Sequence, residues 1–406
     1  MNKLSPPLLK SIERFTVWLE RTEGQSFDPY DLWGTRYGLF ARRLYYRKNP
    51  IGVALVAPLL LMEMFCPGLR MALVQKQRYA TADAQIALAF LNLHSISGDS
   101  RFLREARQIA SHLIESSIPG YSGHCWGYPF AWQYNQGLCE KNTPFITATP
   151  YCFEAFLGLF DVTGDTSYLD VARSIAEFVH KDLHDTPTSP TAAAGSYSPD
   201  DHSEVINASA YRAMVLFEAA FRFNNDAYRQ TAQRNLNFIL ENQRADGAWL
   251  YALDHPSDRF IDHFHTCFVL KNLFKLNRRL NSDAVSAALR KGFEYYQREL
   301  FDREGLPKSF AVEPRRQIVR LEMYNFAEAI TLGALIREEI PAAYDLAQRL
   351  ARLLIQDYQL PEGHFVTRIY IGGFNHTMPF LRWPQAQLFY ALTNLLFTLN
   401  PAAQKP

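Results

Sequence analysis

Acidic residues, in two cases with a histidine beside them, stand at three places in this sequence where proton transfer could occur. Asp201 and His202 lie in the run SYSPDDHSEVINAS, Asp262 and His263 lie in RFIDHFH, and Glu322 lies in VRLEMYN. A carboxylate beside a histidine suits acid–base catalysis, because the carboxylate orients the ring and stabilises its charged form. We predict these five residues as the catalytic set.

These residues also have plainer interpretations. An aspartate before a helix often caps it, and His265, the second histidine of DHFH, could simply pack in the core. A metal site is conceivable there, but the run lacks the i, i+4 histidine pair of helical zinc sites. The sequence also has no dinucleotide fingerprint and no P-loop, so we predict neither a metal nor a cofactor.

Aromatic residues suggest what would be bound. The run GYSGHCWGYPFAWQYNQG interleaves flat rings with glycine and amides, which suits stacking on sugar rings and hydrogen bonding to hydroxyls. We expect several of these rings to pack the loop down instead. Together with polar and aromatic residues near other helix starts, the predicted binding set is Asp83, His124, Trp126, Tyr128, Trp132, Tyr211, Asp246, Trp249, Tyr324, Arg382 and Trp383. The four tryptophans would stack, and Arg382 would clamp an anionic group.

A helical hairpin must position these residues, and residues 149–180 give its clearest copy. Apolar residues recur there at steps of three and four, Gly164 supplies a stop and Asp165 a new start. The first helix is apolar nearly all round and the second has one charged face. We therefore expect the first to be an inner helix and the second an outer one.

The same hairpin recurs along the chain. Its turns fall at Gly98-Asp99, Gly164-Asp165, Asn225-Asp226 and Ser282-Asp283, and a fifth copy turns at Ile340-Pro341. A sixth inner helix, WPQAQLFYALTNLLFTL, has no outer partner after it, and PPLLKSIERFTVWLERT near residue 1 can supply one. Repeats of this size stack to bury a shared core. The prediction is an all-α fold, an (α/α)6 toroid over residues 81–406. Residues 1–80 would form its closing helix and a wrapping segment of the same structural domain.

The connections between hairpins are long, at residues 118–146, 184–205, 244–262, 300–320 and 358–380. They all emerge where the inner helices begin, and helix N-termini carry free N–H groups and partial positive charge. Because long loops in compact domains are often functional, we expect the ligand site in a bowl at this end. The alternative is that the loops only plug the ring.

Composition excludes some classes of protein. The formal charge is +1, from 42 basic and 41 acidic residues, which gives no footprint for nucleic acid. Five cysteines without a CxxC pair indicate free thiols. The first residues do not resemble a signal peptide, so we expect a cytoplasmic protein. Residues 51–65 are apolar but too short to span a bilayer, and we expect them to be buried or, alternatively, to touch a membrane surface. Oligomeric state is not indicated.

Two stretches carry a family resemblance. The hairpin TPYCFEAFLGLFDVTGDTSYLDVARSIAEFV, and QRADGAWLYALD before a polar helix start, resemble the (α/α)6-toroid enzymes of carbohydrate metabolism. These include N-acylglucosamine 2-epimerases, unsaturated glucuronyl hydrolases and the toroidal domain of glucuronyl C5-epimerases. Over about residues 80–400, the resemblance implies an enzyme acting on an oligo- or polysaccharide, uronic ones included, by hydrolysis, epimerisation or elimination.

Two other readings remain open. A non-catalytic saccharide-binding or assembly protein of polysaccharide biosynthesis or export could use the same toroid. A bowl filled by residues 25–80 would favour that reading, and an open bowl with a converging carboxylate and histidine would favour the enzyme. QRADGAW also resembles the QxxDGxW repeat of terpene cyclases, but it occurs once, so a cyclase is the weaker hypothesis.

Overall fold

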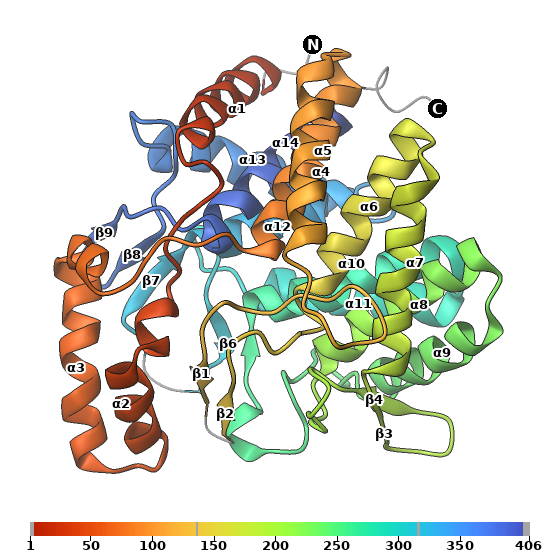
Figure 1. The fold of residues 1–406 in the computed structure, drawn as a ribbon, viewed down its shortest axis with the longest axis horizontal. Coiled ribbons are helices and arrows are strands. Elements are labelled where there is room, and N and C mark those ends of the chain that lie inside the picture. The colour runs from red at the N-terminus through yellow and green to blue at the C-terminus, as the bar shows by residue number, and fades with distance from the viewer. Residues whose placement is uncertain (1–3, 135–136, 315–316, 401–406) are drawn as a thin grey trace.

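A ring of six inner helices forms the centre of the computed structural model, which describes residues 4–134, 137–314 and 317–400. Each inner helix packs against the next, and the last against the first (Figure 1). They are α4 (Ala80–Ser97), α6 (Thr149–Thr163), α8 (Ile206–Phe223), α10 (His263–Leu280), α12 (Met323–Leu335) and α14 (Ala386–Thr398). The predicted (α/α)6 toroid is confirmed.

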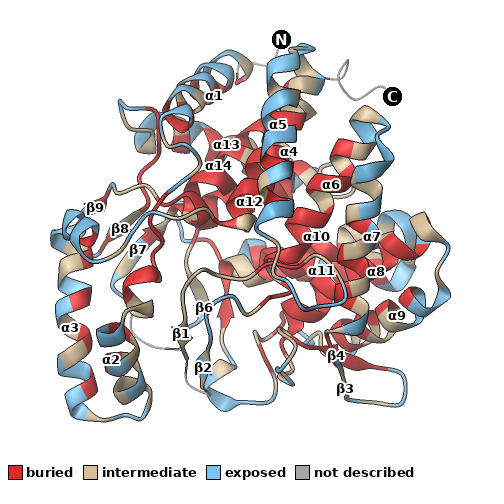
Figure 2. Cartoon of the chain, in the orientation of Figure 1, coloured by how far each residue is buried: buried red, intermediate tan, exposed pale blue. Residues whose placement is uncertain are grey.

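An outer helix follows each of the first five inner helices, and the helix nearest residue 1 packs on the sixth. The outer helices are α5 (Ser100–Glu115), α7 (Thr166–Lys181), α9 (Asp226–Glu241), α11 (Asp283–Glu299), α13 (Pro341–Leu353) and α1 (Ser5–Glu20). Buried residues concentrate on the inner ring, whereas the outer helices bury one face (Figure 2). This is the inner and outer division that the polarity pattern predicted.

The first four hairpin turns share a left-handed residue that ends the inner helix and a side chain that caps the outer helix. Gly98 and Gly164, at φ +69° and +70°, end inner helices in the left-handed conformation, which a glycine adopts without steric cost. The aspartate after each of them caps the outer helix, and Asp165 Oδ1 accepts from the Ser167 N–H at 3.0 Å. The predicted turn positions are therefore confirmed.

Ring closure depends on α1. Phe15 stacks on Phe389 of α14 at 4.9 Å and on Phe365 at 5.9 Å. Arg14 Nη2 also donates to the Leu360 carbonyl at 2.7 Å. The helix nearest the first residue is thus held by residues more than 340 positions later in the chain.

The long connections carry small antiparallel sheets. β1 (Trp132–Gln133) pairs with β2 (Leu138–Cys139), β3 (Asp185–Pro187) with β4 (Ala193–Gly195), β5 (Ile261–Asp262) with β6 (Phe310–Val312), and β7 (Val319–Glu322) with β8 (Arg368–Tyr370), which pairs with β9 (Asn375–His376). Short helical turns are η3 (Pro256–Asp258), η4 (Leu354–Tyr358) and η5 (Leu381–Gln385). Because β5–β6 and β7–β8 join loops from successive hairpins, the loop end of the ring is held together by backbone hydrogen bonds.

Residues 25–80 form a helical hairpin beside the ring (Figure 1). Its elements are η1 (Asp31–Gly34), α2 (Arg36–Tyr46), α3 (Pro50–Phe65) and η2 (Pro67–Ala72). The expectation that residues 51–65 are buried is wrong, since much of α3 is exposed (Figure 2). None of the described helices combines the length and hydrophobicity needed to cross a bilayer.

Candidate active site

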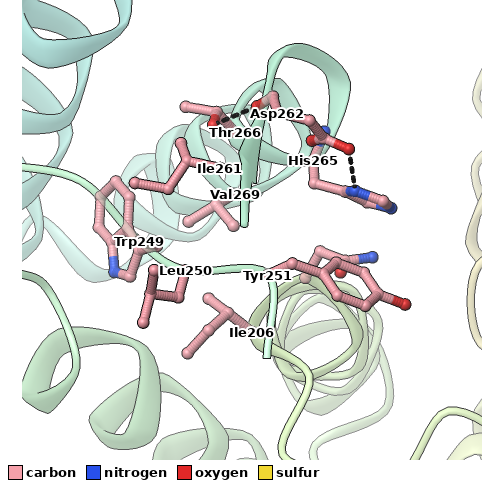
Figure 3. Close-up of a pocket in the computed structure, with 10 residues that line it drawn as sticks. Ile206, Trp249, Leu250, Tyr251, Ile261, Asp262, His265, Thr266 and Val269 are labelled. Carbon is pink, nitrogen blue, oxygen red and sulfur yellow. Dashed lines mark hydrogen bonds and ion pairs between the residues drawn. The ribbon is translucent and has the colours of Figure 1, made fainter. Parts of the chain in front are cut away.

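An aspartate–histidine pair lies at the start of α10. Asp262 ends β5 and caps the helix, with Oδ1 accepting from the His265 N–H at 3.0 Å and Oδ2 lying 2.7 Å from His265 Nδ1 (Figure 3). Since the buried carboxylate accepts, Nδ1 is the donor in this contact, and in the neutral ring Nε2 has a lone pair available. No hydrogen bond to Nε2 is found within the described part of the chain. The pair therefore has the arrangement of an oriented general base.

The surroundings of His265 fix its ring. It packs on Tyr251 at 4.5 Å between centroids, with the two rings tilted by 43°, and both lie at one side of the close-up (Figure 3). A cavity of about 10 Å³ lies behind the pair, lined by apolar residues that include Ile206 and Val269. It holds at most about one water molecule and is too small for a sugar.

The mouth is the end of the ring where the inner helices begin and the long loops lie. Glu322 is its second titratable group, after His265. It ends β7 just before α12, and its Oε2 lies 3.3 Å from Arg368 Nε. Oε1 is buried and finds no hydrogen-bond partner in the described residues. Burial outweighs the charge of Arg368 and a hydrogen bond with Trp383, and so raises the pKa of Glu322 to about 7. This carboxyl group can hold a proton at neutral pH and donate it.

A stack of rings connects these two groups. Trp383 lies 3.8 Å from Tyr324 and nearly parallel to it, and Phe264 meets both edge-on at 5.2 and 5.4 Å. Phe264 is the chain neighbour of His265, and Trp383 bonds Glu322. The starts of α10, α12 and α14 thus bring the base, the acid and an aromatic platform to one mouth.

Two residues of the 25–80 segment, Asp28 and Tyr30, line another side of the mouth. Arg382, 5 % exposed, forms a two-point ion pair with Asp28, including Nη2 to Oδ1 at 2.8 Å, and stacks over Tyr128 at 4.4 Å. The prediction that Arg382 clamps an anionic ligand is therefore wrong, because its charge is already paired. Tyr30 stacks on Trp132 at 5.5 Å. Trp132 remains half-exposed, and its role as a binding residue stays a prediction.

Three other predicted residues are buried away from the mouth. His263 accepts from or donates to the Tyr296 hydroxyl at 2.7 Å, and burial lowers its pKa to about 3. One helical step rotates a side chain by about 100°, so His263 faces the outer ring while Asp262 and His265 do not. Trp126 and Trp249 are 1 % and 3 % exposed, and their indole N–H groups donate to the carbonyls of Leu113 and Ile239. The predictions that His263 is catalytic and that these two rings stack on a ligand are wrong.

Asp201 and His202 do not form a pair resembling that of Asp262 and His265. Asp201 Oδ2 accepts from the Tyr197 N–H and the Ser203 hydroxyl, both at 2.7 Å, which stabilises the loop. The exposed His202 ring stacks on His184 at 5.9 Å.

The remaining predicted binding residues lie at different depths. Tyr211 is buried, and its hydroxyl bonds that of Tyr151 at 2.7 Å. His124 stacks on Trp126 beside α7, and Asp246 sits in an exposed turn where it accepts from the Ala248 N–H. Neither His124 nor Asp246 joins the cluster around Trp383.

Asp83 lines a separate hollow of about 340 Å³ with Arg78, His112, Glu115 and Asn142 among its other walls. Arg78 pairs with both oxygens of Asp83, at 3.1 and 3.2 Å. Burial nevertheless raises the pKa of Asp83 to about 6. This polar hollow is a second place where a ligand could lie.

His265 and Asp28 are two of the residues at the mouth that the predicted set lacks. The spacing of Asp262 and His265, an N-cap and the third residue of its helix, was a usable signal for the first. Nothing local marks Asp28, whose partner is 354 residues away. Among the described residues, no group of three His, Cys, Asp or Glu side chains is placed to hold a metal ion.

Comparisons with known proteins find similar structures but no similar sequence family. No family model and no curated protein matches the sequence. Among solved structures, an α-mannanase from Bacteroides thetaiotaomicron aligns with a TM-score of 0.60 at 10 % identity, covering 79 % of this chain and 86 % of that one. Cellobiose 2-epimerase from Bacillus thermoamylovorans gives 0.60 at 11 %, covering 79 % and 88 %. An unsaturated glucuronyl hydrolase specific for heparin gives 0.58 at 12 %, covering 79 % and 85 %. The chain has the fold of these toroidal proteins.

Proposed function

We propose that this protein is a carbohydrate-active enzyme that transfers protons on a saccharide bound at the mouth of the toroid. The observation that carries the proposal is the pairing of Asp262 with His265, which the rings of Phe264 and Trp383 link to Glu322, whose pKa burial raises to about 7. A base with an available lone pair and an acid that keeps its proton at neutral pH are the two parts that such a reaction needs. The toroidal relatives whose names refer to sugars support the saccharide as substrate.

The chemistry we propose is epimerisation or isomerisation of an open-chain sugar. His265 Nε2 removes a proton from the carbon beside the carbonyl, and the C–H electron pair forms the C=C bond of an enediol. The carbonyl π pair moves to oxygen, which takes the proton of Glu322. To form an isomer, protonated His265 gives its proton to the former carbonyl carbon while the neighbouring enediol hydroxyl gives its proton to the Glu322 carboxylate. To form an epimer, the enediol presents its opposite face to protonated His265, which returns the proton to the same carbon while the first hydroxyl gives its proton back to Glu322. Hydrolysis would use two carboxylates, whereas this pair is a histidine and a carboxylic acid.

A neutral saccharide fits better than a uronic one. Arg382 is paired with Asp28, and Arg368 faces Glu322. Asp28 neutralises Arg382, and the ionised Glu63 near Arg368 offsets the charge of Arg368 while Glu322 is protonated, so neither arginine offers a strong site to a sugar carboxylate. Trp383, half-exposed on its Tyr324 backing, supplies the stacking surface. We place the protein in the cytoplasm, a location that its five free cysteines support.

Proton NMR in D2O tests the proposal. Incubation with a panel of reducing mono- and oligosaccharides is expected to remove the signal of the hydrogen beside the carbonyl and to produce epimer or isomer signals. His265→Ala and Glu322→Gln are each expected to lower the exchange rate by about 10²- to 10⁴-fold. His202→Ala is the matched control at the mouth loop and is expected to keep the rate.

Other results would contradict the proposal in identifiable ways. New reducing-end signals without deuterium incorporation would mean hydrolysis, and vinyl signals would mean elimination. If His202→Ala abolished turnover and His265→Ala did not, the base would belong to the loop around residue 202.

A non-catalytic saccharide-binding protein is the second candidate. The contacts of Asp28 and Tyr30 favour it, because they bring the 25–80 segment into the mouth. Saccharide line broadening without any deuterium incorporation would support this candidate.

A further inference from the structure

Helix α3 has its polarity inverted relative to an ordinary surface helix. Val53, Leu61 and Phe65 are 57 %, 56 % and 54 % exposed, while the one charged residue of the helix, Glu63, is 8 % exposed. A helix on a globular surface normally turns its apolar stripe inward and its charges outward. The outward face of α3 therefore needs an apolar partner.

The inverted orientation is fixed by buried charges. Glu63 contacts Arg70, which also pairs with Asp31, and Glu63 Oε1 lies 3.1 Å from His376 Nε2. Burial alone would raise the pKa of Glu63, but the hydrogen bond with His376 and the charge of Arg70 hold it at about 2. Rolling α3 over to bury its leucines would leave these charges unpaired, at a cost of several kcal/mol.

The exposed apolar face continues beyond α3. The apolar surface comprises Ile51, Val53, Leu60, Leu61, Phe65, Leu69, Met71, Leu73, Ile371 and Phe374, each at least 40 % exposed. Phe65 at the end of α3 meets Phe374 of the β8–β9 turn at 5.5 Å. Helix α3, η2 and this turn lie along one edge of the molecule (Figure 1). A patch assembled from separate segments marks an interaction site rather than scattered exposed residues.

Basic residues accompany this apolar surface. The chain between Asp31 and Glu63 contains five basic residues and no acidic one. Arg36, Arg43, Arg47 and Lys48 are exposed on α2 and on the turn into α3, together with Tyr37 and Phe40. The near-zero charge of the whole chain thus hides a local positive cluster beside the apolar surface.

We propose that the α2–α3 hairpin binds peripherally to a lipid bilayer that carries anionic headgroups. The apolar surface would enter the boundary between headgroups and acyl chains, and the basic cluster would contact the headgroup phosphates, as in other interfacial helices. A second copy of this chain fits less well, because a symmetric contact would bring two positive clusters together. The inference does not depend on the proposed enzyme activity.

Vesicle co-sedimentation of the full chain tests this inference. The protein is expected to sediment with vesicles of mixed phosphatidylcholine and phosphatidylglycerol, and less with phosphatidylcholine alone or at high salt. Leu60→Ser/Leu61→Ser/Phe65→Ser and Arg43→Glu/Arg47→Glu/Lys48→Glu are each expected to lower partitioning to the mixed vesicles at least tenfold. Val17→Ser/Val162→Ser/Phe221→Ser changes three exposed apolar residues on α1, α6 and α8 and is expected to bind like the unchanged protein.

Circular dichroism would verify that each variant is folded. Equal binding by the Leu60/Leu61/Phe65 variant and its control would overturn the inference, as would no binding of the unchanged protein. Sedimentation velocity without lipid tests whether the apolar surface binds a second copy of the chain instead of a bilayer. A dimer that the same three serines convert to a monomer would assign the surface to a second copy of the chain.

Discussion

At the scale of single residues, the mouth shows how one helical position decides a role. His263 and His265 stand two residues apart, yet one bonds Tyr296 in the core and the other bonds Asp262 at the mouth. Sequence spacing could identify Asp262 as a cap and place residue 265 on its face. It could not say that position 263 meets a tyrosine of α11, because that contact depends on how the outer ring packs.

Glu322 makes a pH prediction. Only its protonated form can donate, so turnover should fall as pH rises through about 7. The free energy of unfolding should also fall as pH rises from about 4.5 to about 7, because the unfolded chain releases this proton first. The pH dependence of kcat/KM measures the first effect, with Glu322→Gln as the variant that should lose this limb. A profile of the unchanged protein that stays flat across pH 7 would remove Glu322 from the mechanism.

At the scale of elements, the features that sequence predicted well are the local ones. A glycine followed by an aspartate ends one helix and starts the next without help from distant residues. The glycine adopts the left-handed turn, and the aspartate caps the helix that follows it. The orientation of α3 has no such local cause. Glu63 faces inward because Arg70 and His376 contact it there, and His376 belongs to β9, 313 positions later.

The caps can be tested by substitution. Asp165→Ala removes the acceptor for the Ser167 N–H and should lower the free energy of unfolding by about 1 kcal/mol. Asp226→Ala is the control, because Asn225 rather than Asp226 caps the next outer helix and the Asp226 side chain is 81 % exposed. It should change stability by less than about 0.5 kcal/mol. Urea denaturation compares the two, and equal losses would show that the cap contributes little.

At the scale of the whole molecule, the repeat predicted the ring and which end carries the long loops. It did not give distances across the mouth, which depend on β5–β6 and β7–β8 pairing between loops of successive hairpins. Nor did it show that Asp28 would reach Arg382. Pairing between distant segments leaves no periodic signature, so the architecture was predictable and the composition of the mouth was predictable only in part.

Closure of the ring rests on Phe15. Phe15→Ala should lower the free energy of unfolding by about 3–5 kcal/mol, because the ring is fully buried between Phe365 and Phe389. Val17→Ala, on the exposed side of the same helix, should cost less than about 0.5 kcal/mol. Thermal and denaturant unfolding of both variants would measure the difference. A small effect at Phe15 would mean that α1 is a dispensable attachment to the ring.

The position of α1 also bears on how the chain is made. Its apolar face is translated well before its partners around residues 360–389, which come more than 340 residues later. At typical synthesis rates of about 5–20 residues per second, that face waits roughly 20 to 75 s for them. During this interval the nascent toroid is an open arc with an unfilled end. Chaperones that bind exposed apolar surface would therefore have time to act during synthesis. The inner helix that covers α1 is α14, the last inner helix to be made.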